Sequence, residues 1–253
     1  MITPLIEICV EGIDGLLAAQ LGGADRAELC ASLLEGGLTP SDGVVRQALS
    51  RATIPFHVII RPRGGDFLYS DAEFATMLDD AKRLRELGVA GIVIGCLMPD
   101  GTVDEARTTA LAAAARPASV TFHRAFDVTA DPHAALEALI RCGIDRVLTS
   151  GQRPTAIEGS KLLARLHAQA AGRIIVMGCG ALGPETIGRV RQETALTELH
   201  FSALAARPSA MRHRRPEIAM GAAGPAREYH IEVTDPDLVA RTILAAGRVA
   251  REG

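Results

Sequence analysis

The stretch Val120-Thr121-Phe122-His123-Arg124-Ala125-Phe126-Asp127 indicates both how the chain folds and where its chemistry lies. It begins as a short apolar run, which is typical of a strand buried in a parallel sheet. It ends in an imidazole, a guanidinium and a carboxylate, groups that are costly to bury unless they are paired. We therefore interpret it as a strand that crosses a core and delivers His123, Arg124 and Asp127 to a cleft. The alternative is a salt-bridged loop in which Arg124 and Asp127 pair only with each other.

Similar apolar runs recur along the 253 residues and alternate with segments whose apolar positions repeat at three- and four-residue steps. The runs predict strands at Ile6–Cys9, Ala27–Cys30, His57–Ile60, Gly91–Ile94, Val120–Phe122, Arg146–Leu148, Ile174–Met177 and Glu198–Phe201. The other segments predict helices at Gly15–Leu21, Gly43–Leu49, Asp71–Glu86, Asp104–Ala114, Pro132–Arg141, Ala156–Ala170 and Pro184–Gln192. This alternation predicts an α/β protein with a (β/α)8 barrel of the TIM type. An open doubly wound sheet is the runner-up, but no GxGxxG follows the first strand.

The pattern loosens from Pro208 onward. We expect residues 208–253 to form a loop followed by a terminal helix at Asp235–Arg248 that packs on the barrel. The basic run Arg212–Arg215 reads as a solvated loop or as an anion-facing flap over the barrel mouth. No linker rich in Pro, Gly or Ser separates a second domain, so residues 1–253 are expected to form a single domain.

Composition restricts the partners and the compartment. A net charge of -3 and 3% aromatic residues argue against nucleic acid as a partner. No run of 18 or more apolar residues is present to span a membrane, and the N-terminus lacks a charged leader. The five cysteines are widely spaced without a CxxC, which fits reduced thiols. We expect a cytoplasmic protein.

In a barrel of this type, function is expected at the carboxyl ends of the strands. Glu7 and Cys9 are two residues apart and so share one face of the first strand, and Glu28 and Cys30 have the same spacing on the second. The other strand ends and their loops add Arg61, Arg63, His123, Arg124, Asp127, Ser150, His200 and Ser202. The opposite ends of the strands are plainer, so the polarity of the strands also favours a working cleft.

These residues fit acid/base chemistry on a small anionic metabolite. His123, Glu7 and Glu28 are the candidate catalytic groups for proton transfer next to a carbonyl. Arginine suits carboxylate or phosphate, and the candidate anion-binding residues are Arg61, Arg63, Arg124, Asp127, Ser150, His200 and Ser202. No GxSxG, HExxH or Walker motif is present. The alternative is a buried ion-pair network that only fixes the barrel.

Five segments of the sequence carry a further signal: Gly23–Cys30, Gly36–Ser41, Arg61–Phe67, Thr121–Asp127 and Arg146–Gly151. They resemble the copper homeostasis protein CutC family, and the resemblance runs from residue 5 to about 203. It implies a TIM-type barrel that is cytoplasmic, forms a homodimer or a higher homo-oligomer, and handles copper(I). It also implies copper binding at the cysteines of the first two strands, which are Cys9 and Cys30 here.

Copper(I) is soft and prefers thiolate or thioether ligands. Cys9 and Cys30 would lie on neighbouring strands, about 4.8 Å apart in a sheet. The competing interpretation is that both are small buried apolar side chains. Cys179 is a candidate third ligand, whereas Cys96 and Cys142 look structural. A third hypothesis is a scaffold whose barrel only presents a dimer surface.

Overall fold

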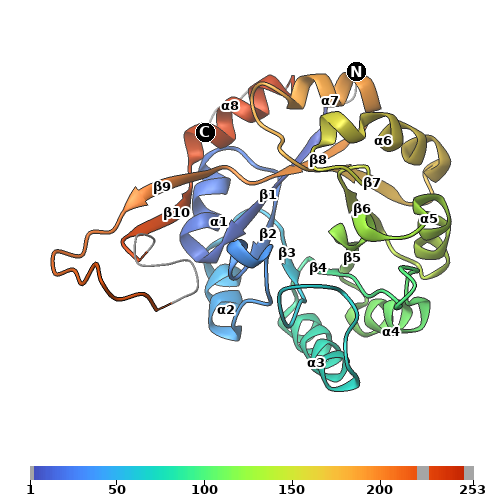
Figure 1. Cartoon of the computed structure of the whole chain (residues 1–253), viewed down its shortest axis with the longest axis horizontal. Coiled ribbons are helices and arrows are strands. Elements are labelled where there is room, and N and C mark those ends of the chain that lie inside the picture. Colours follow the sequence, from blue (N-terminus) through green and yellow to red (C-terminus); the bar gives the residue numbers. More distant parts are fainter. Residues whose placement is uncertain (1–2, 221–227, 248–253) are drawn as a thin grey trace.

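The computed structural model describes residues 3–220 and 228–247, and its centre is a closed ring of parallel strands (Figure 1). The ring contains β1 (Leu5–Glu11), β2 (Arg26–Cys30), β3 (Phe56–Ile59), β4 (Gly91–Ile94), β5 (Ser119–Phe122), β6 (Arg146–Thr149), β7 (Ile175–Gly178) and β8 (Glu198–Phe201). Each strand pairs with the next in the chain, and β8 closes on β1 with Glu7 opposite His200. The predicted (β/α)8 barrel is confirmed, and the open sheet is excluded.

Helices surround the ring, one after each strand (Figure 1). They are α1 (Gly12–Leu21), α2 (Asp42–Arg51), α3 (Asp71–Leu87), α4 (Glu105–Ala115), α5 (Pro132–Arg141), α6 (Ala156–Ala170), α7 (Ile187–Thr194) and α8 (Pro236–Ala245), with short 3-10 turns η1 (Leu33–Glu35) and η2 (Arg124–Val128). Local sequence sets their starts: Ser70 with Glu73, and Thr155 with Glu158, form capping boxes on α3 and α6.

The two faces of each strand have different neighbours. Ile6, Ile8 and Val10 of β1 are fully buried in the main hydrophobic core. Glu7 and Cys9 alternate with them and so face the interior of the ring. The interior also holds two small apolar clusters, Cys30–Ile59–Val93 and Leu148–Met177–Cys179. The alternation of β1 therefore turns its charged and sulfur-bearing residues into the barrel.

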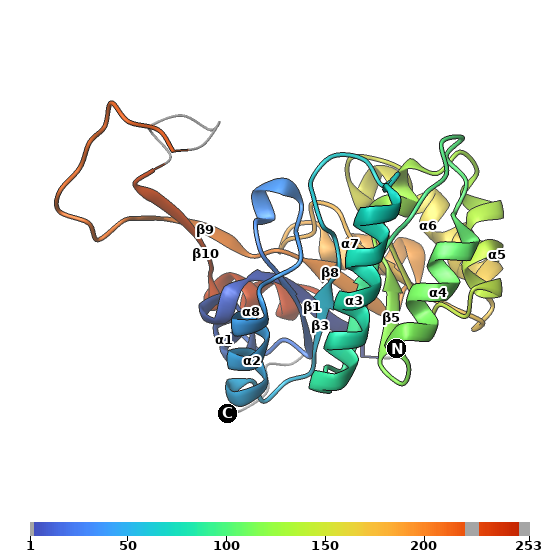
Figure 2. The same ribbon diagram turned by 90° about the horizontal axis from the view of Figure 1, so that it is seen from below.

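The C-terminal part contains an element that the sequence did not predict. β9 (Leu204–Pro208) and β10 (His230–Thr234) pair antiparallel and form an arm that projects away from the barrel (Figure 2). After it, α8 buries Val239 and Ile243 on the barrel side, and Arg248, the last residue of the expected helix, lies outside the described residues. No helix of the described residues is both long and apolar enough to cross a membrane.

Helix α6 packs directly on the loop that follows β6. A Cβ atom on Gly159 would lie 1.9 Å from the Ser150 carbonyl oxygen. We predict that Gly159→Ala lowers the free energy of unfolding by about 1–3 kcal/mol, because backbone and not a flexible side chain must move. Gly43→Ala is the matched control, since Gly43 is also helical and its Cβ would meet only Ser41 Oγ, at 3.8 Å. Urea unfolding of both variants tests this, and equal stability of Gly159→Ala and the wild type would contradict it.

Candidate functional site at the barrel mouth

A network of buried ion pairs forms a floor across the barrel interior. Arg26 donates from Nε to Glu7 and from Nη2 to Glu198 Oε2 at 2.6 Å. Arg146 donates to both oxygens of Glu198, at 2.6 and 3.1 Å. All four side chains are nearly inaccessible to solvent. Glu7 is therefore a member of a buried ion-pair network, and its partner there is Arg26.

Glu7 belongs to this floor and does not line the cavity above it. Burial would raise the pKa of Glu7, but the charge of Arg26, the hydrogen bond from His200 and the charge of His57 together hold it well below its usual range. Glu7 is therefore a fixed carboxylate whose oxygens are already engaged.

His200 connects the floor to the mouth of the barrel. Its Nδ1 lies 2.8 Å from Glu7 Oε1, and its Nε2 lies 3.6 Å from Glu28 Oε2. Burial would lower the pKa of His200, but its hydrogen bonds with Cys9 and Glu7 and the charges of both carboxylates raise it well above its usual range. The ring is therefore an imidazolium between two acidic side chains.

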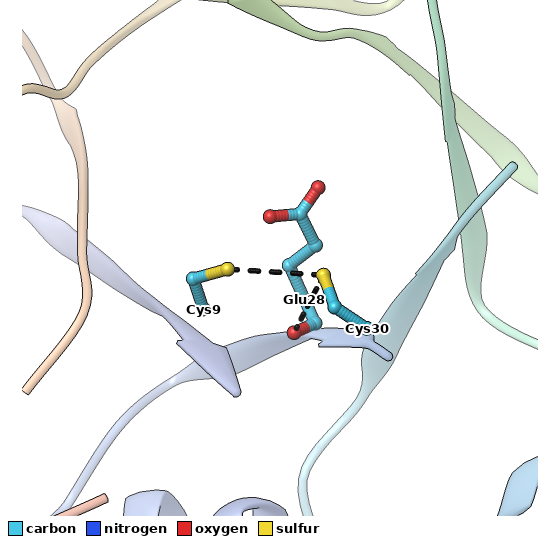
Figure 3. A group of neighbouring side chains, drawn as sticks. All are labelled: Cys9, Glu28 and Cys30. Carbon is cyan, nitrogen blue, oxygen red and sulfur yellow. Dashed lines mark hydrogen bonds between the residues drawn. The ribbon is translucent and has the colours of Figure 1, made fainter. Parts of the chain in front are cut away.

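Cys9 and Cys30 meet above this floor (Figure 3). Cys9 is in register with Glu28, and Cys30 with Glu11, so the two cysteines sit diagonally in the ladder. Their Sγ atoms are nevertheless 3.8 Å apart, and a Glu28 carboxylate oxygen lies within 4.8 Å of both. The stagger of the barrel therefore does not separate the two sulfurs.

Both thiols are held in the protonated form. The hydrogen bond to Cys30, burial and nearby Glu28 raise the pKa of Cys9 well above its usual range. For Cys30 the hydrogen bond from Cys9 lowers the pKa, but burial and Glu28 outweigh it and raise this pKa to about 11. A cation that binds both sulfurs must therefore displace protons.

The mouth contains a cavity of about 420 Å³. Of the residues that the sequence singled out, it brings together Cys9, Glu28, Arg61, His123, Arg124, Cys179, His200 and Ser202 as lining residues. It leaves out Glu7, Cys30, Arg63, Asp127 and Ser150, and none of the basic residues Arg212–Arg215 reaches it. Cys30 is buried, with its Sγ 3.8 Å from that of the lining residue Cys9.

His123 follows β5, which lies across the ring from β1. Its Nδ1 accepts a hydrogen bond from the Ala125 N–H at 3.1 Å, at the start of η2. Burial and then the charge of Arg61 lower the pKa of His123 to about 3, so the ring is neutral. Because Nδ1 accepts, the ring proton resides on Nε2. That nitrogen is buried and has no hydrogen-bond partner in the part of the chain that the structure describes.

Arg61 ties together the loops after β2 and β3. It donates from Nη1 to the carbonyls of Glu35 and Gly37, at 2.5 and 3.1 Å, and from Nη2 to that of Gly65 at 2.9 Å. The residue is 6% exposed, and its Nε has no acceptor among residues 3–220 and 228–247. Its charge therefore meets carbonyl dipoles rather than a carboxylate.

A hydrogen-bonded group of three side chains lies at the rim: Arg124, Asp127 and Ser150. Arg124 donates to Asp127 Oδ2 at 2.8 Å and to Ser150 Oγ at 3.0 Å. Asp127 also accepts from Thr149 Oγ1 and from the backbone N–H groups of Ser150 and Gln152. Arg124 and Asp127 thus form a salt bridge but do not pair only with each other, and Arg124 also lines the cavity.

Arg63 is engaged in its own loop. It donates to Glu73 at 2.7 Å, to Asp66 at 3.0 Å and to three carbonyls of residues 64–68. The structure therefore gives Arg63 a role in holding the loop after β3.

Comparison with known proteins identifies the family. The model of the CutC family matches residues 4–205. The chain belongs to the CutC family. A CutC family protein of Mesorhizobium japonicum is 62% identical over 243 residues, which cover 96% of this chain and 94% of that protein. The human "copper homeostasis protein cutC homolog" is 46% identical over 244 residues, which cover 96% of this chain and 89% of that protein.

Solved structures agree with this assignment. The putative copper homeostasis protein CutC of Streptococcus agalactiae is 34% identical with a TM-score of 0.74, covering 79% of this chain and 98% of that one. Phosphoribosyl anthranilate isomerase of Thermococcus kodakaraensis covers 99% of this chain and 100% of that one with a TM-score of 0.55. At 15% identity the isomerase shares only the fold.

Sequence reasoning missed most of the floor of this CutC family member. Arg26, His57, Arg146 and Glu198 are all buried, but only Glu7 of the network was singled out. A signal was present, because Arg26 and Glu198 stand two residues before Glu28 and His200. Two residues along a strand share a face, so each charged pair indicated a second polar layer inside the barrel.

The neutral state of His123 predicts a pH dependence of stability. In the unfolded chain this histidine takes up a proton as the pH falls through its usual pKa of 6.5. In the folded protein the pKa of His123 is about 3, so the ring takes up its proton only near pH 3. Stability is therefore lost as the pH falls from 6.5, by up to about 1.4 kcal/mol per pH unit for one group. We predict that His123→Phe makes the free energy of unfolding fall less steeply between about pH 6 and pH 5. Urea unfolding measures the slope, with Phe67→Leu, which removes the neighbouring ring but no titratable group, as control. Identical slopes for the wild type and His123→Phe would contradict the assignment.

Proposed function

We propose that this CutC family protein binds copper(I) as its cargo through Cys9 and Cys30. The observation that supports this most strongly is the 3.8 Å approach of their Sγ atoms. Thiolates are the ligands that copper(I) prefers, and Cys9 lines the cavity through which an ion can arrive. Glu28 is the nearest oxygen donor to the pair. The human relative, which carries the name of a copper homeostasis protein, supports the same function.

The surroundings of the pair favour a cation that replaces protons. Both cysteines release a proton to become thiolates, so the apparent affinity for copper(I) should rise with pH. His200 is an imidazolium facing Glu7 and Glu28, which assigns it to charge balance rather than to ligation. The cysteine pair thus offers two sulfurs, and the positive charge of the neighbouring His200 is balanced by Glu7 and Glu28.

The proposal includes a cytoplasmic location and a homodimer or higher homo-oligomer. All five cysteines are free, which suits a reducing compartment. The β9–β10 arm carries exposed Met211, at 60%, and Ile231, at 48%, and such residues on a projecting arm suit contact with a second copy.

The test is copper(I) binding in competition with a chromophoric chelator under reducing conditions. We predict that Cys9→Ser with Cys30→Ser weakens binding at least about a hundredfold, or about 2.8 kcal/mol. Cys96→Ser with Cys142→Ser is the matched control, since these two buried thiols lie outside the cavity, and it should bind as the wild type does. Native mass spectrometry of the same samples reads copper stoichiometry and subunit number. Unchanged affinity in the Cys9/Cys30 variant would contradict the proposal.

An acid/base enzyme acting on a small anionic metabolite is a second candidate. The observation that favours it is that His123, Glu28 and Arg61 line one cavity. In this candidate Glu28 is the base and His123 a hydrogen-bond donor, while Glu7 only supports His200. A small anion that co-purifies with the protein and appears in the native mass spectrum would support it.

A further inference from the structure

The charge of Arg61 is unusual for a buried guanidinium. Among the described residues no carboxylate oxygen lies within 4.0 Å of its nitrogens, and its three hydrogen bonds all go to backbone carbonyls. A buried charge without an opposite charge is costly, typically by several kcal/mol. Despite this cost Arg61 is buried, with only 6% of its surface exposed, and it lines the cavity. An anion in the cavity would supply the missing partner.

Two hydrogen-bond donors on this wall lack acceptors. Among the described residues, Arg61 Nε and His123 Nε2 are both buried without a hydrogen-bond partner of normal geometry, and so is the Tyr69 hydroxyl, whose pKa burial raises and the neighbouring Arg61 guanidinium lowers. A buried donor left unpaired costs about 1–3 kcal/mol. Such groups are rare in native proteins and call for an explanation at each position. Here Arg61 and His123 line the same cavity.

The two donors share one apolar neighbour. The ring centroid of Phe67 lies 4.9 Å from that of His123, and Arg61 Cζ lies 5.2 Å from the Phe67 centroid. Phe67 also lines the cavity, and Arg124 lines it at the rim. Nη1 of Arg124 makes no hydrogen bond to any described residue, whereas its Nε and Nη2 are engaged by Asp127 and Ser150.

We propose that this wall is a binding subsite for the oxyanion group of a small metabolite, a carboxylate or a phosphate. The oxyanion accepts from Arg61 Nε and His123 Nε2, and Arg124 meets it at the rim. The cavity of about 420 Å³ accommodates a metabolite-sized ligand. The subsite is independent of copper(I) binding at Cys9 and Cys30, and it gives the acid/base candidate its ligand class.

Water alone does not meet these requirements. A single water molecule can accept from one or both donors, but it leaves the Arg61 charge without a counter-charge. A cation is disfavoured by the same charge. Glu28 is a carboxyl group that lines the same cavity, so the anion is expected on the side of Arg61 and His123, away from Glu28.

The experiment measures binding of inorganic phosphate, pyruvate and the neutral amide of pyruvate to the full chain by calorimetry. Nuclear magnetic resonance of the histidine ring nitrogens identifies the contact. We expect saturable binding of phosphate, pyruvate or both, a shift of the His123 Nε2–H signal, and no binding of the amide. His123→Phe keeps a planar ring beside Phe67 and should lower the affinity for the anion at least about tenfold, or about 1.4 kcal/mol.

Matched variants separate this inference from the copper proposal. Cys9→Ser with Cys30→Ser should bind the anion as the wild type does. His123→Phe should bind copper(I) as the wild type does, which also shows that the His123→Phe variant is folded. His133→Phe, at an exposed position on α5, should behave as the wild type in both assays. Binding of pyruvate alone assigns the carboxylate class, and binding of phosphate alone assigns the phosphate class. Failure of both anions to bind, or equal affinity of His123→Phe and the wild type, would overturn the subsite.

Discussion

The ion pairs of Arg26 with Glu7 and Glu198 are the constraint on which the mouth of the barrel depends. They place a guanidinium between two carboxylates inside the ring, where an unpaired charge would be strongly destabilising. Glu7 in turn accepts from His200, and His200 faces Glu28 and Cys9. The floor therefore fixes the charge of the residues that surround the cysteine pair.

The cavity above this floor has two chemically different walls. The wall from β1, β2 and β8 carries Cys9, Glu28 and His200, which suit a soft cation that exchanges with protons. The wall from β3 and β5 carries Arg61 and His123, which offer donors and a positive charge. Because each wall disfavours the ligand of the other, one mouth can hold a cation and an anion at separate places.

The sequence predicted the barrel because its signal is local. Short apolar runs at regular intervals correspond to β1–β8, and each strand is buried by the helices around it. β10 was missed because it pairs only with β9 on an exposed arm, so residues such as His230 and Glu232 carry no alternation of buried and exposed positions. Strand pairing of this kind depends on a partner elsewhere in the chain and leaves little trace in the segment itself.

The site was predictable in residue type but not in detail. Strand-end position placed His123, Arg61 and Glu28 at one rim, and the structure has all three lining one cavity. It could not show that Arg63 and Asp127 are occupied by hydrogen bonds within their own loops, or that Glu7 lies one layer below Cys9. These outcomes depend on side-chain partners and on the stagger of the ring, which residue spacing does not contain.

The most direct test of the account is X-ray absorption at the copper K-edge of the copper(I)-loaded protein. If Cys9 and Cys30, which lie above the floor, form a ligand pair, the copper has two sulfur neighbours in the wild type and none when both cysteines are serine. A first shell made only of nitrogen and oxygen in the wild type, or a sulfur shell that persists in the serine variant, would contradict it.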